Sequence, residues 1–182
     1  MAVAGCGGIG SNVAVALTRA GIGALVLADF DNVELSNLNR QHFFLSDVGK
    51  PKTEALAAHL EAIYPAVNLV LHPVEVTSGN VVELFGAADV LIEAFDRAEN
   101  KVMLIETWCK NFPRRPVICA SGISGSGNTE TLKVRRAGQI IVCGDETTDM
   151  SAGLVSARVA IVAAMQANEA IAYLFEDGMK KQ

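Results

Sequence analysis

The sequence predicts a single α/β domain built around a mostly parallel sheet with helices on both faces. Short apolar segments alternate with longer segments of helical periodicity along the 182 residues of the chain, which is the pattern of β-α-β units. Hydrophobic residues make up 51% of the sequence, as expected when both faces of a sheet are buried. A glycine-rich turn between the first two segments is typical of Rossmann-like sheets. We expect this domain to cover residues 1–182.

The first half of the chain is predicted to supply three strands and two helices. The first strand is shorter than the usual length of about five or six residues, so we expect the chain to lack a few N-terminal residues. Apolar residues recur with helical spacing in the two helices and alternate in the third strand. The elements are a strand at 2–4, a helix at 10–20 stopped by Gly21, a strand at 24–28, a polar stretch at 29–47, a helix at 52–64 ending near Pro65 and a strand at 67–71.

The second half is predicted to continue the alternation and to end in a hairpin and a long helix. A Thr or Ser is expected to cap the first of its helices. The elements are a helix at 77–85, a strand at 90–92 ending at Glu93, a helix at 98–110, a strand at 116–120, a flexible Gly- and Ser-rich stretch at 122–127, a hairpin of 131–135 and 139–142 turning at Ala137 and Gly138, and a helix at 153–175.

Charge and polarity exclude several classes of protein. The net charge is −5, from 15 basic and 20 acidic residues, which argues against a general nucleic-acid-binding protein. The last apolar segment contains Arg158 and Glu169, charges that a membrane span does not readily accommodate. No secretory signal precedes the first glycine. We therefore expect a soluble, cytoplasmic protein with neither a nucleic-acid nor a membrane partner.

The cysteines give no sign of a zinc site. None of the four, which are Cys6, Cys109, Cys119 and Cys143, belongs to a C-x-x-C pair, the spacing that structural zinc sites usually need. We predict reduced and mostly buried thiols and no bound zinc.

A G-x-G-x-x-G pattern predicts a nucleotide-binding loop at the N-terminus. Gly5, Gly7 and Gly10, with Gly8 beside them, lie between the first strand and the first helix. In such loops the first glycine permits a tight turn, the second lets the backbone approach phosphate, and the third lets helix and strand pack closely. Asp29 ends the second strand, where an acid binds the ribose hydroxyls. A purely structural glycine turn is the alternative.

The polar residues after Asp29 favour ATP over NAD. Asn37, Arg40, Gln41 and Lys52 follow it within a short stretch. Arg40 can bind phosphate oxygens with two parallel hydrogen bonds, and Lys52 supplies a point charge near the start of a helix. A triphosphate attacked at phosphorus needs such cations to stabilise the leaving pyrophosphate, whereas an NAD site does not. Solvated surface cations are the alternative interpretation.

Asp96 is the candidate magnesium ligand. It follows the fourth strand, at the carboxyl edge where α/β sheets bind ligands, and a carboxylate there can hold Mg²⁺ that bridges phosphates. Glu93 is a weaker candidate for a supporting role. The alternative is that Asp96 caps the helix that begins near Ala98.

Three segments taken together resemble the ThiF/MoeB family, which includes the ubiquitin-activating enzymes. They are G-C-G-G-I-G-S, then L-A-D-F-D-N-V-E-L-S-N-L-N-R-Q, then D-V-G-K-P-K-T-E. The later segments E-A-F-D-R-A-E-N-K, A-S-G and M-Q-A-N look like the short ThiF-like branch linked to thiamine biosynthesis. The resemblance then covers nearly the whole chain.

The resemblance implies an adenylyltransferase that uses Mg-ATP. It implies that the C-terminal glycine carboxylate of a small ubiquitin-fold sulfur carrier, similar to ThiS, is activated as an acyl-adenylate, and that the chain forms a homodimer. The implied roles are a nucleotide cradle of Gly5, Gly7, Gly8 and Gly10, ribose binding by Asp29, phosphate binding by Asn37, Arg40, Gln41 and Lys52, and magnesium binding by Asp96. Catalytic roles fall to Arg40, Lys52 and Asp96. The 122–127 stretch is then either a mobile loop over the carrier's tail or a flexible connection.

The chain departs from the family pattern at several points. Many relatives bind zinc through two C-x-x-C pairs, and many carry a reactive cysteine for which Cys143 is the nearest candidate here. Arg97 follows Asp96, where relatives usually have Asn. The N-terminal helix from which relatives supply an arginine to the partner subunit is not found.

Three other functions compete with the leading hypothesis. The first is a dehydratase that adenylates a carboxylate on modified tRNA, against which the acidic balance weighs. The second is an NAD(P)-dependent oxidoreductase, which leaves Arg40, Lys52 and Asp96 unexplained. The third is a nucleotide-binding scaffold without catalysis.

Overall fold

The computed structural model describes residues 1–180, and the side chains up to residue 175. Within these residues the strands form one seven-stranded sheet in the order β3-β2-β1-β4-β5-β7-β6. Every pair is parallel except β6 with β7. The strands are β1 (Ala2–Ala4), β2 (Ala24–Ala28), β3 (Asn68–His72), β4 (Leu91–Glu93), β5 (Val117–Ala120), β6 (Lys133–Ala137) and β7 (Ile140–Gly144). The predicted α/β class and parallel sheet are confirmed, while the predicted domain bounds include two residues outside the described part.

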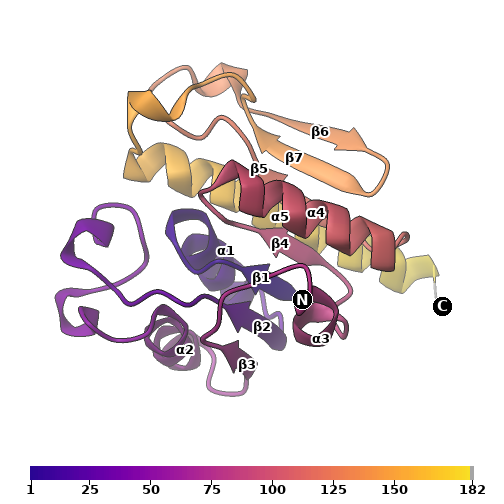
Figure 1. The fold of residues 1–182 in the computed structure, drawn as a ribbon, viewed down its shortest axis with the longest axis horizontal. Coiled ribbons are helices and arrows are strands. Elements are labelled where there is room, and N and C mark those ends of the chain that lie inside the picture. Colours follow the sequence, from indigo (N-terminus) through magenta and orange to yellow (C-terminus); the bar gives the residue numbers. More distant parts are fainter. Residues whose placement is uncertain (181–182) are drawn as a thin grey trace.

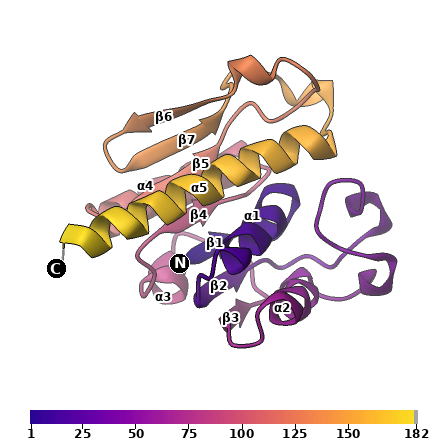
Figure 2. The ribbon, with the colours of Figure 1, turned by 180° about the vertical axis from the view of Figure 1, so that it is seen from behind.

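Helices cover both faces of this sheet (Figures 1 and 2). On one face α1, α2 and α5 pack around Leu17, Leu56 and Val162. On the other face α3 and α4 pack around Phe85 and Trp108. The helices are α1 (Gly8–Arg19), α2 (Lys52–Ile63), α3 (Val81–Phe85), α4 (Ala98–Asn111) and α5 (Ser156–Lys180). Within the described residues no helix combines the length and the apolar character that crossing a membrane requires.

The predicted starts of two helices were wrong. The helix expected at 77–85 begins only at Val81, because the side chain of Asn80 closes a turn before it by accepting a hydrogen bond from Thr77 N (2.8 Å). The helix expected from residue 153 begins at Ser156. Gly153 has φ +74°, and its carbonyl accepts a hydrogen bond from Gly125 N (2.8 Å). Its backbone is therefore part of a loop-to-loop contact and not of a helix.

The hairpin near the C-terminus is confirmed, with both strands shifted toward the C-terminus. β6 and β7 are joined through Gly138, which has φ +60°. Gly21 likewise follows the end of α1 with φ +84°, as its predicted role as a stop requires.

The strand order places a ligand-binding edge next to the glycine turn. β1 lies between β2 and β4, so that the connections after β1 and β4 leave toward opposite faces of the sheet. Ligands of open α/β sheets bind at such a switch point, outside the carboxyl ends of the strands. Ala4, Ala28 and Glu93 are register partners at these ends. The turns that follow them therefore meet at one edge.

Candidate functional site

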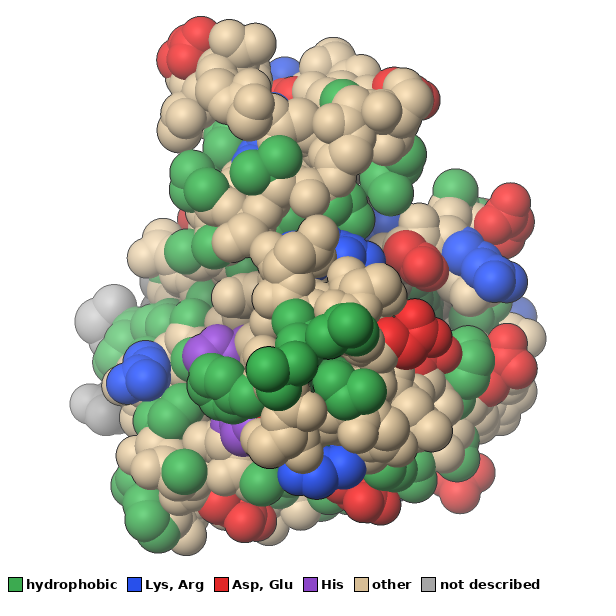
Figure 3. Space-filling model, turned by 90° about the vertical axis from the view of Figure 1, so that its left-hand side faces the viewer, with side chains coloured by type: hydrophobic (Ala, Val, Ile, Leu, Met, Phe, Trp, Pro, Cys, Tyr) green, Lys and Arg blue, Asp and Glu red, His purple; other side chains and the backbone are tan. Residues whose placement is uncertain are grey.

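A pocket of about 450 Å³ opens at the carboxyl edge of the sheet. Figure 3 looks onto this edge and shows acidic and basic side chains next to one another on the surface. The lining combines the glycine turn, the ends of β2, β4 and β5, and the loop before α5. It includes Gly5, Gly7, Gly8, Asp29, Arg40, Gln41, Lys52, Asp96, Arg97, Lys101, Gly122, Ile123 and Thr148. The tertiary structure thus brings together most of the predicted site residues.

The glycines of the first turn act for the steric reasons expected from the sequence. Gly5 has φ +93°. A Cβ on Gly10 would lie 1.7 Å from the Gly5 carbonyl oxygen, whereas a Cβ on Gly7 would meet only Gln41 Nε2 at 3.7 Å. Gly10 does not line the pocket; it lets α1 approach β1. Gly7 precedes α1 without a side-chain cap, so the free N–H groups and positive end of this helix face the pocket.

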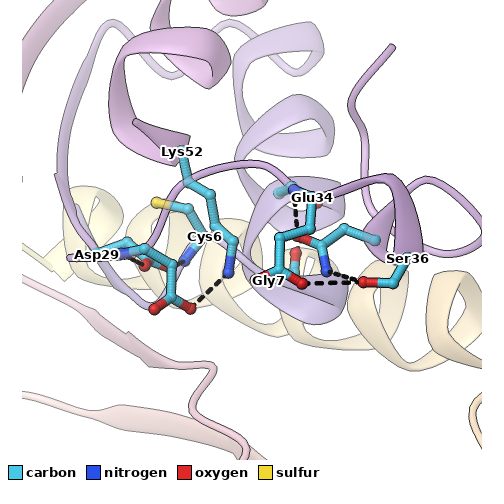
Figure 4. A network of polar contacts seen from close by, with 9 residues as sticks. Cys6, Gly7, Asp29, Glu34, Ser36 and Lys52 are labelled. Carbon is cyan, nitrogen blue, oxygen red and sulfur yellow. Dashed lines mark hydrogen bonds and ion pairs between the residues drawn. The ribbon is translucent and has the colours of Figure 1, made fainter. Parts of the chain in front are cut away.

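Asp29 lies at the end of β2 with both carboxylate oxygens held by backbone amides. Cys6 N donates to Oδ2 (2.6 Å) and Asp31 N donates to Oδ1 (2.9 Å). Burial raises the pKa of the Asp29 carboxyl, and the nearby charge of Lys52 opposes this effect. Figure 4 shows Asp29 against the glycine turn. A carboxylate oxygen has more than one lone pair, so Asp29 keeps acceptor capacity for hydroxyl groups in the pocket.

Lys52 is a nearly buried cation at the first position of α2. Its side chain is 8% exposed, and Nζ lies 2.7 Å from Asp31 Oδ2. In Figure 4 the side chain extends from the helix toward the segment after β2. The charge is therefore held at the pocket by a carboxylate that is itself half exposed, at 49%. The alternative of a freely solvated Lys52 does not apply.

Arg40 and Gln41 are fixed against the start of α1. Asn12 Nδ2 donates to the Arg40 carbonyl oxygen (3.1 Å), and Arg40 Nη1 donates to Ser36 O (3.0 Å) and Asn39 Oδ1 (2.8 Å). Gln41 Oε1 is buried without a hydrogen-bond partner in the described structure. This amide oxygen is available to a donor in the pocket.

Asn37 lies in a different environment from the other predicted phosphate ligands. It does not belong to the pocket lining; it is buried, and its Oδ1 accepts a hydrogen bond from Glu34 N (3.1 Å) in the turn η1 (Leu35–Asn37). The observed contact shapes the loop that carries Arg40. Phosphate binding by Asn37 stays a prediction.

Asp96 is exposed and lines the pocket just before α4. The N-cap of α4 is Arg97, without a side-chain hydrogen bond, so Asp96 does not cap the helix as the alternative interpretation proposed. Within the described residues the Asp96 carboxylate has no hydrogen bond or ion pair, and no group of three or more His, Cys, Asp or Glu side chains could hold a metal.

Two ion pairs at this edge, one buried and one partly buried, were not predicted from the sequence. Lys101 Nζ lies 2.8 Å from Glu93 Oε2, and Arg158 Nη2 lies 2.5 Å from Asp145 Oδ2. The sequence indicates Glu93 only as a weak candidate, and it predicts no role for Lys101 beyond membership of the helix at 98–110 and of the segment E-A-F-D-R-A-E-N-K. No local pattern links Asp145 to Arg158, because the contact depends on how α5 packs.

The cysteines are unsuited to nucleophilic chemistry. Cys6, Cys119 and Cys143 are buried, and Cys109 is half-buried. Burial raises the pKa of Cys119 to about 11 and that of Cys143 to about 12. A thiol reacts as its thiolate, so Cys143 lacks the environment of a reactive cysteine.

Comparison with known proteins assigns the chain to a family. The model of the ThiF family matches residues 1–182. The chain belongs to the ThiF family. The sulfur carrier protein adenylyltransferase of Thermus thermophilus is 35% identical over 103 residues, which are 56% of this chain and 38% of that protein. The tRNA threonylcarbamoyladenosine dehydratase of Bacillus subtilis is 32% identical over 139 residues, 75% of this chain and 53% of that protein.

Solved structures share the fold of this ThiF-family chain. The Escherichia coli tRNA N6-threonylcarbamoyladenosine dehydratase in complex with ATP superimposes with a TM-score of 0.79 at 23% identity, covering 96% of this chain and 86% of that one. The chain spans between 38% and 53% of the length of the two curated relatives described above.

Proposed function

We propose that this chain binds ATP in the carboxyl-edge pocket and transfers the adenylyl group to a carboxylate. The observation that carries the proposal is the convergence of a glycine turn, Asp29, Arg40, Lys52 and Asp96 on one pocket. Each of these residues has the chemistry that one part of a nucleoside triphosphate needs. The ATP complex of the structurally similar dehydratase supports the choice of nucleotide. An oxidoreductase would leave Lys52 and Asp96 without a role.

The proposed nucleotide contacts follow from the chemistry of the lining. The N-terminal amides of α1 and the turn at Gly7 bind phosphate, and Asp29 accepts hydrogen bonds from the ribose hydroxyls. Arg40 and Lys52 neutralise the β- and γ-phosphates. Gly5 and Gly10 keep the turn in the required shape, while Gly8 and Gln41 line the same side of the pocket.

The residues of the pocket fit magnesium. Mg²⁺ is usually held by one or two carboxylates together with phosphate oxygens and water. Asp96 supplies one such carboxylate with no competing protein partner among the described residues. When bound, the ion neutralises phosphate charge during the transfer.

The proposed reaction forms a bond between a carboxylate oxygen and the α-phosphorus and breaks the bond to the bridging oxygen, releasing pyrophosphate. The attacking carboxylate is already ionised at neutral pH, since a C-terminal carboxyl has a pKa of about 3.3–3.7. No general base is needed. Catalysis by this chain then consists of positioning and of stabilising the pyrophosphate charge through Arg40 and Lys52.

The proposed substrate is the C-terminal glycine of a ThiS-like, ubiquitin-fold sulfur carrier, in a thiamine-type pathway. The sequence segments quoted above and the Thermus relative support this choice. The second candidate is adenylation of the carboxylate on a threonylcarbamoyl-modified tRNA, which the Bacillus relative favours because it aligns with more of this chain. A cytoplasmic location and a homodimer complete the proposal; light scattering after gel filtration tests the homodimer.

Exchange of labelled pyrophosphate into ATP tests the proposal. We expect exchange that requires Mg²⁺ and a carrier ending in Gly-Gly. Exchange stimulated only by modified tRNA would favour the second candidate. A protein that binds NADH but does not bind ATP would favour an oxidoreductase. ATP binding without exchange in the presence of either substrate would leave a non-catalytic scaffold.

Substitution of Asp96 tests the proposed magnesium ligand. We expect Asp96→Ala to abolish exchange and to leave the unfolding transition unchanged, because this side chain is exposed and has no hydrogen bond or ion pair among the described residues. Glu99→Ala, an exposed acid one turn further along α4, is the matched control. Retained exchange in Asp96→Ala would show that magnesium is held elsewhere.

A further inference from the structure

Lys101 lines the pocket, yet its charge is fully engaged by the protein. Nζ lies 3.0 Å from Glu93 Oε1, 2.8 Å from Glu93 Oε2 and 3.3 Å from the Ala120 carbonyl oxygen. An ammonium group has three donors, and three protein acceptors surround this one. Lys101 thus differs from Lys52, whose single ion pair is with a half-exposed carboxylate. Lys101 could contact a phosphate directly only by breaking one of these three hydrogen bonds.

Glu93 connects this cation to the turn that carries Asp96. Its side chain is fully buried at the end of β4, and Oε1 accepts a hydrogen bond from Phe95 N (2.7 Å). One carboxylate therefore contacts the backbone immediately before Asp96 and the ammonium on the second turn of α4. Through Ala120, the same ammonium also reaches the end of β5. The turn between β4 and α4 is held at both of its ends.

We propose that Lys101 and Glu93 are positioning residues, which fix the turn after β4 so that Asp96 faces the nucleotide phosphates. The inference rests on the proposed function, since it assigns a purpose to the place of Asp96. The Asp96 side chain has no hydrogen bond or ion pair of its own among the described residues, so its backbone decides where its carboxylate lies. The ion pair of the buried Glu93 with the partly exposed Lys101 is the contact that sets this backbone against β5.

A comparison of nucleotide binding with and without magnesium tests the proposal. Isothermal titration calorimetry measures the affinity for ATP in Mg²⁺ and in EDTA for the wild type, Lys101→Met, Lys101→Arg and the double variant Glu93→Gln/Lys101→Met. Lys110→Met, an exposed lysine at the end of the same helix, is the control. Residues that support a metal ligand typically contribute roughly 10–100-fold to metal affinity. In Lys101→Met we expect the affinity for ATP measured in Mg²⁺ to fall about tenfold and the affinity measured in EDTA to be unchanged.

The double variant separates positioning from stability. Lys101→Met leaves a buried carboxylate without its partner and is expected to lower the melting temperature. The double variant contains no such charge and should regain stability, while its magnesium-dependent affinity stays low because the link to β5 is still absent. Lys101→Arg should retain the affinity.

The outcomes distinguish this inference from the proposed function. A wild type that does not bind ATP would overturn the proposed function, and the inference with it. A different set of results would overturn only the positioning role. In that case the wild type binds Mg-ATP, Asp96→Ala loses the magnesium dependence of ATP binding, and the folded double variant keeps it. Equal loss of ATP binding in Mg²⁺ and in EDTA would also contradict the positioning role, because a general structural role would then explain the effect.

Discussion

The carboxylate of Asp145 and the guanidinium of Arg158 form a buried ion pair with 2.5 Å between Oδ2 and Nη2. The two side chains are 4% and 6% exposed. Arg158 Nη1 also donates to the Gly127 carbonyl oxygen (2.8 Å), so that α5 holds the stretch after β5 and the loop after β7 together. The 122–127 stretch is therefore tied to the protein, although its glycines favour flexibility. These segments form one wall of the pocket.

Removing the charge of Asp145 should strongly destabilise the protein. Asp145→Asn leaves the buried guanidinium without its counter-ion, and breaking such a pair costs about 3 kcal/mol or more. Urea unfolding followed by far-UV circular dichroism measures the free energy of unfolding. Asp149→Asn, in the exposed turn of the same loop where this side chain accepts a hydrogen bond from Ser151 N, is the control and should cost less than about 1 kcal/mol, because Asn caps such a turn about as well as Asp. Equal losses of unfolding free energy in the two variants would show that the buried ion pair contributes no more to stability than a surface side chain of the same loop.

The contribution of Asp145 should disappear in acid. The Thr148 hydroxyl, the amides of Thr147 and Thr148 and the charge of Arg158 hold the pKa of this carboxyl well below its usual range, against the effect of burial. A carboxyl whose pKa is lower in the folded than in the unfolded state stabilises the fold at pH values above its unfolded pKa, which is about 3.9 for Asp. This stabilisation is lost as the pH falls below that value. The difference in free energy of unfolding between wild type and Asp145→Asn should be constant between pH 5 and 7, by the same argument, and narrow below about pH 4. A constant difference through this range would contradict the assignment.

Two glycines of the nucleotide turn should respond differently to a methyl group. In Gly10→Ala the new Cβ meets the Gly5 carbonyl oxygen at 1.7 Å, so we expect a loss of roughly 3 kcal/mol of stability, at the upper end of overpacking effects. In Gly7→Ala the Cβ has an ordinary contact at 3.7 Å. That variant should fold normally and bind ATP more weakly, because the methyl enters the pocket. Thermal unfolding and ATP titration measure the two effects, and Gly23→Ala, with nothing within 4 Å of its Cβ, is the control.

Lys52 should contribute to binding of the phosphates and little to folding. Lys52→Met keeps the buried stem and removes the charge, leaving the half-exposed Asp31 to water. A hydrogen bond to a charged group contributes about 1.5–3 kcal/mol, so the dissociation constant for ATP should rise roughly 10–100-fold. Calorimetric titration with ATP and adenosine makes the measurement. Adenosine binding should be unchanged, and Lys50→Met, an exposed neighbour, should affect neither ligand.

The thiol of Cys143 should be dispensable. Because burial raises its pKa to about 12, almost none of this thiol is ionised at neutral pH. We expect Cys143→Ala to retain pyrophosphate exchange, and native protein treated with iodoacetamide to be alkylated first at Cys109, which is the least buried cysteine. Mass spectrometry locates the modified residue. Loss of exchange in a folded Cys143→Ala variant would restore this thiol as a candidate.

Local sequence patterns were enough to predict the sheet class, the glycine turn and the ribose-binding candidate Asp29. These features follow from local rules. Apolar periodicity reflects burial of an element, and the close approach of Gly10 to Gly5 is a steric requirement within one turn. Asp29 was found because an acid at the end of the second strand is a short-range signal. The helix starts at Ser156 and Val81 were missed because side-chain and loop contacts outside the periodic pattern decide them.

The pairing of the charges, in contrast, depends on how the helices pack against the sheet. The charged residues of the proposed site, Asp29, Arg40, Lys52 and Asp96, line one pocket, whereas Asn37 is turned into its own loop. Lys101 and Glu93 meet because α4 folds back over β4, and Asp145 meets Arg158 because α5 packs beside β5 and β7. These ion pairs join consecutive elements, with separations of 8 and 13 residues, and their distances of a few ångströms depend on how each helix packs, which no periodicity or local motif encodes.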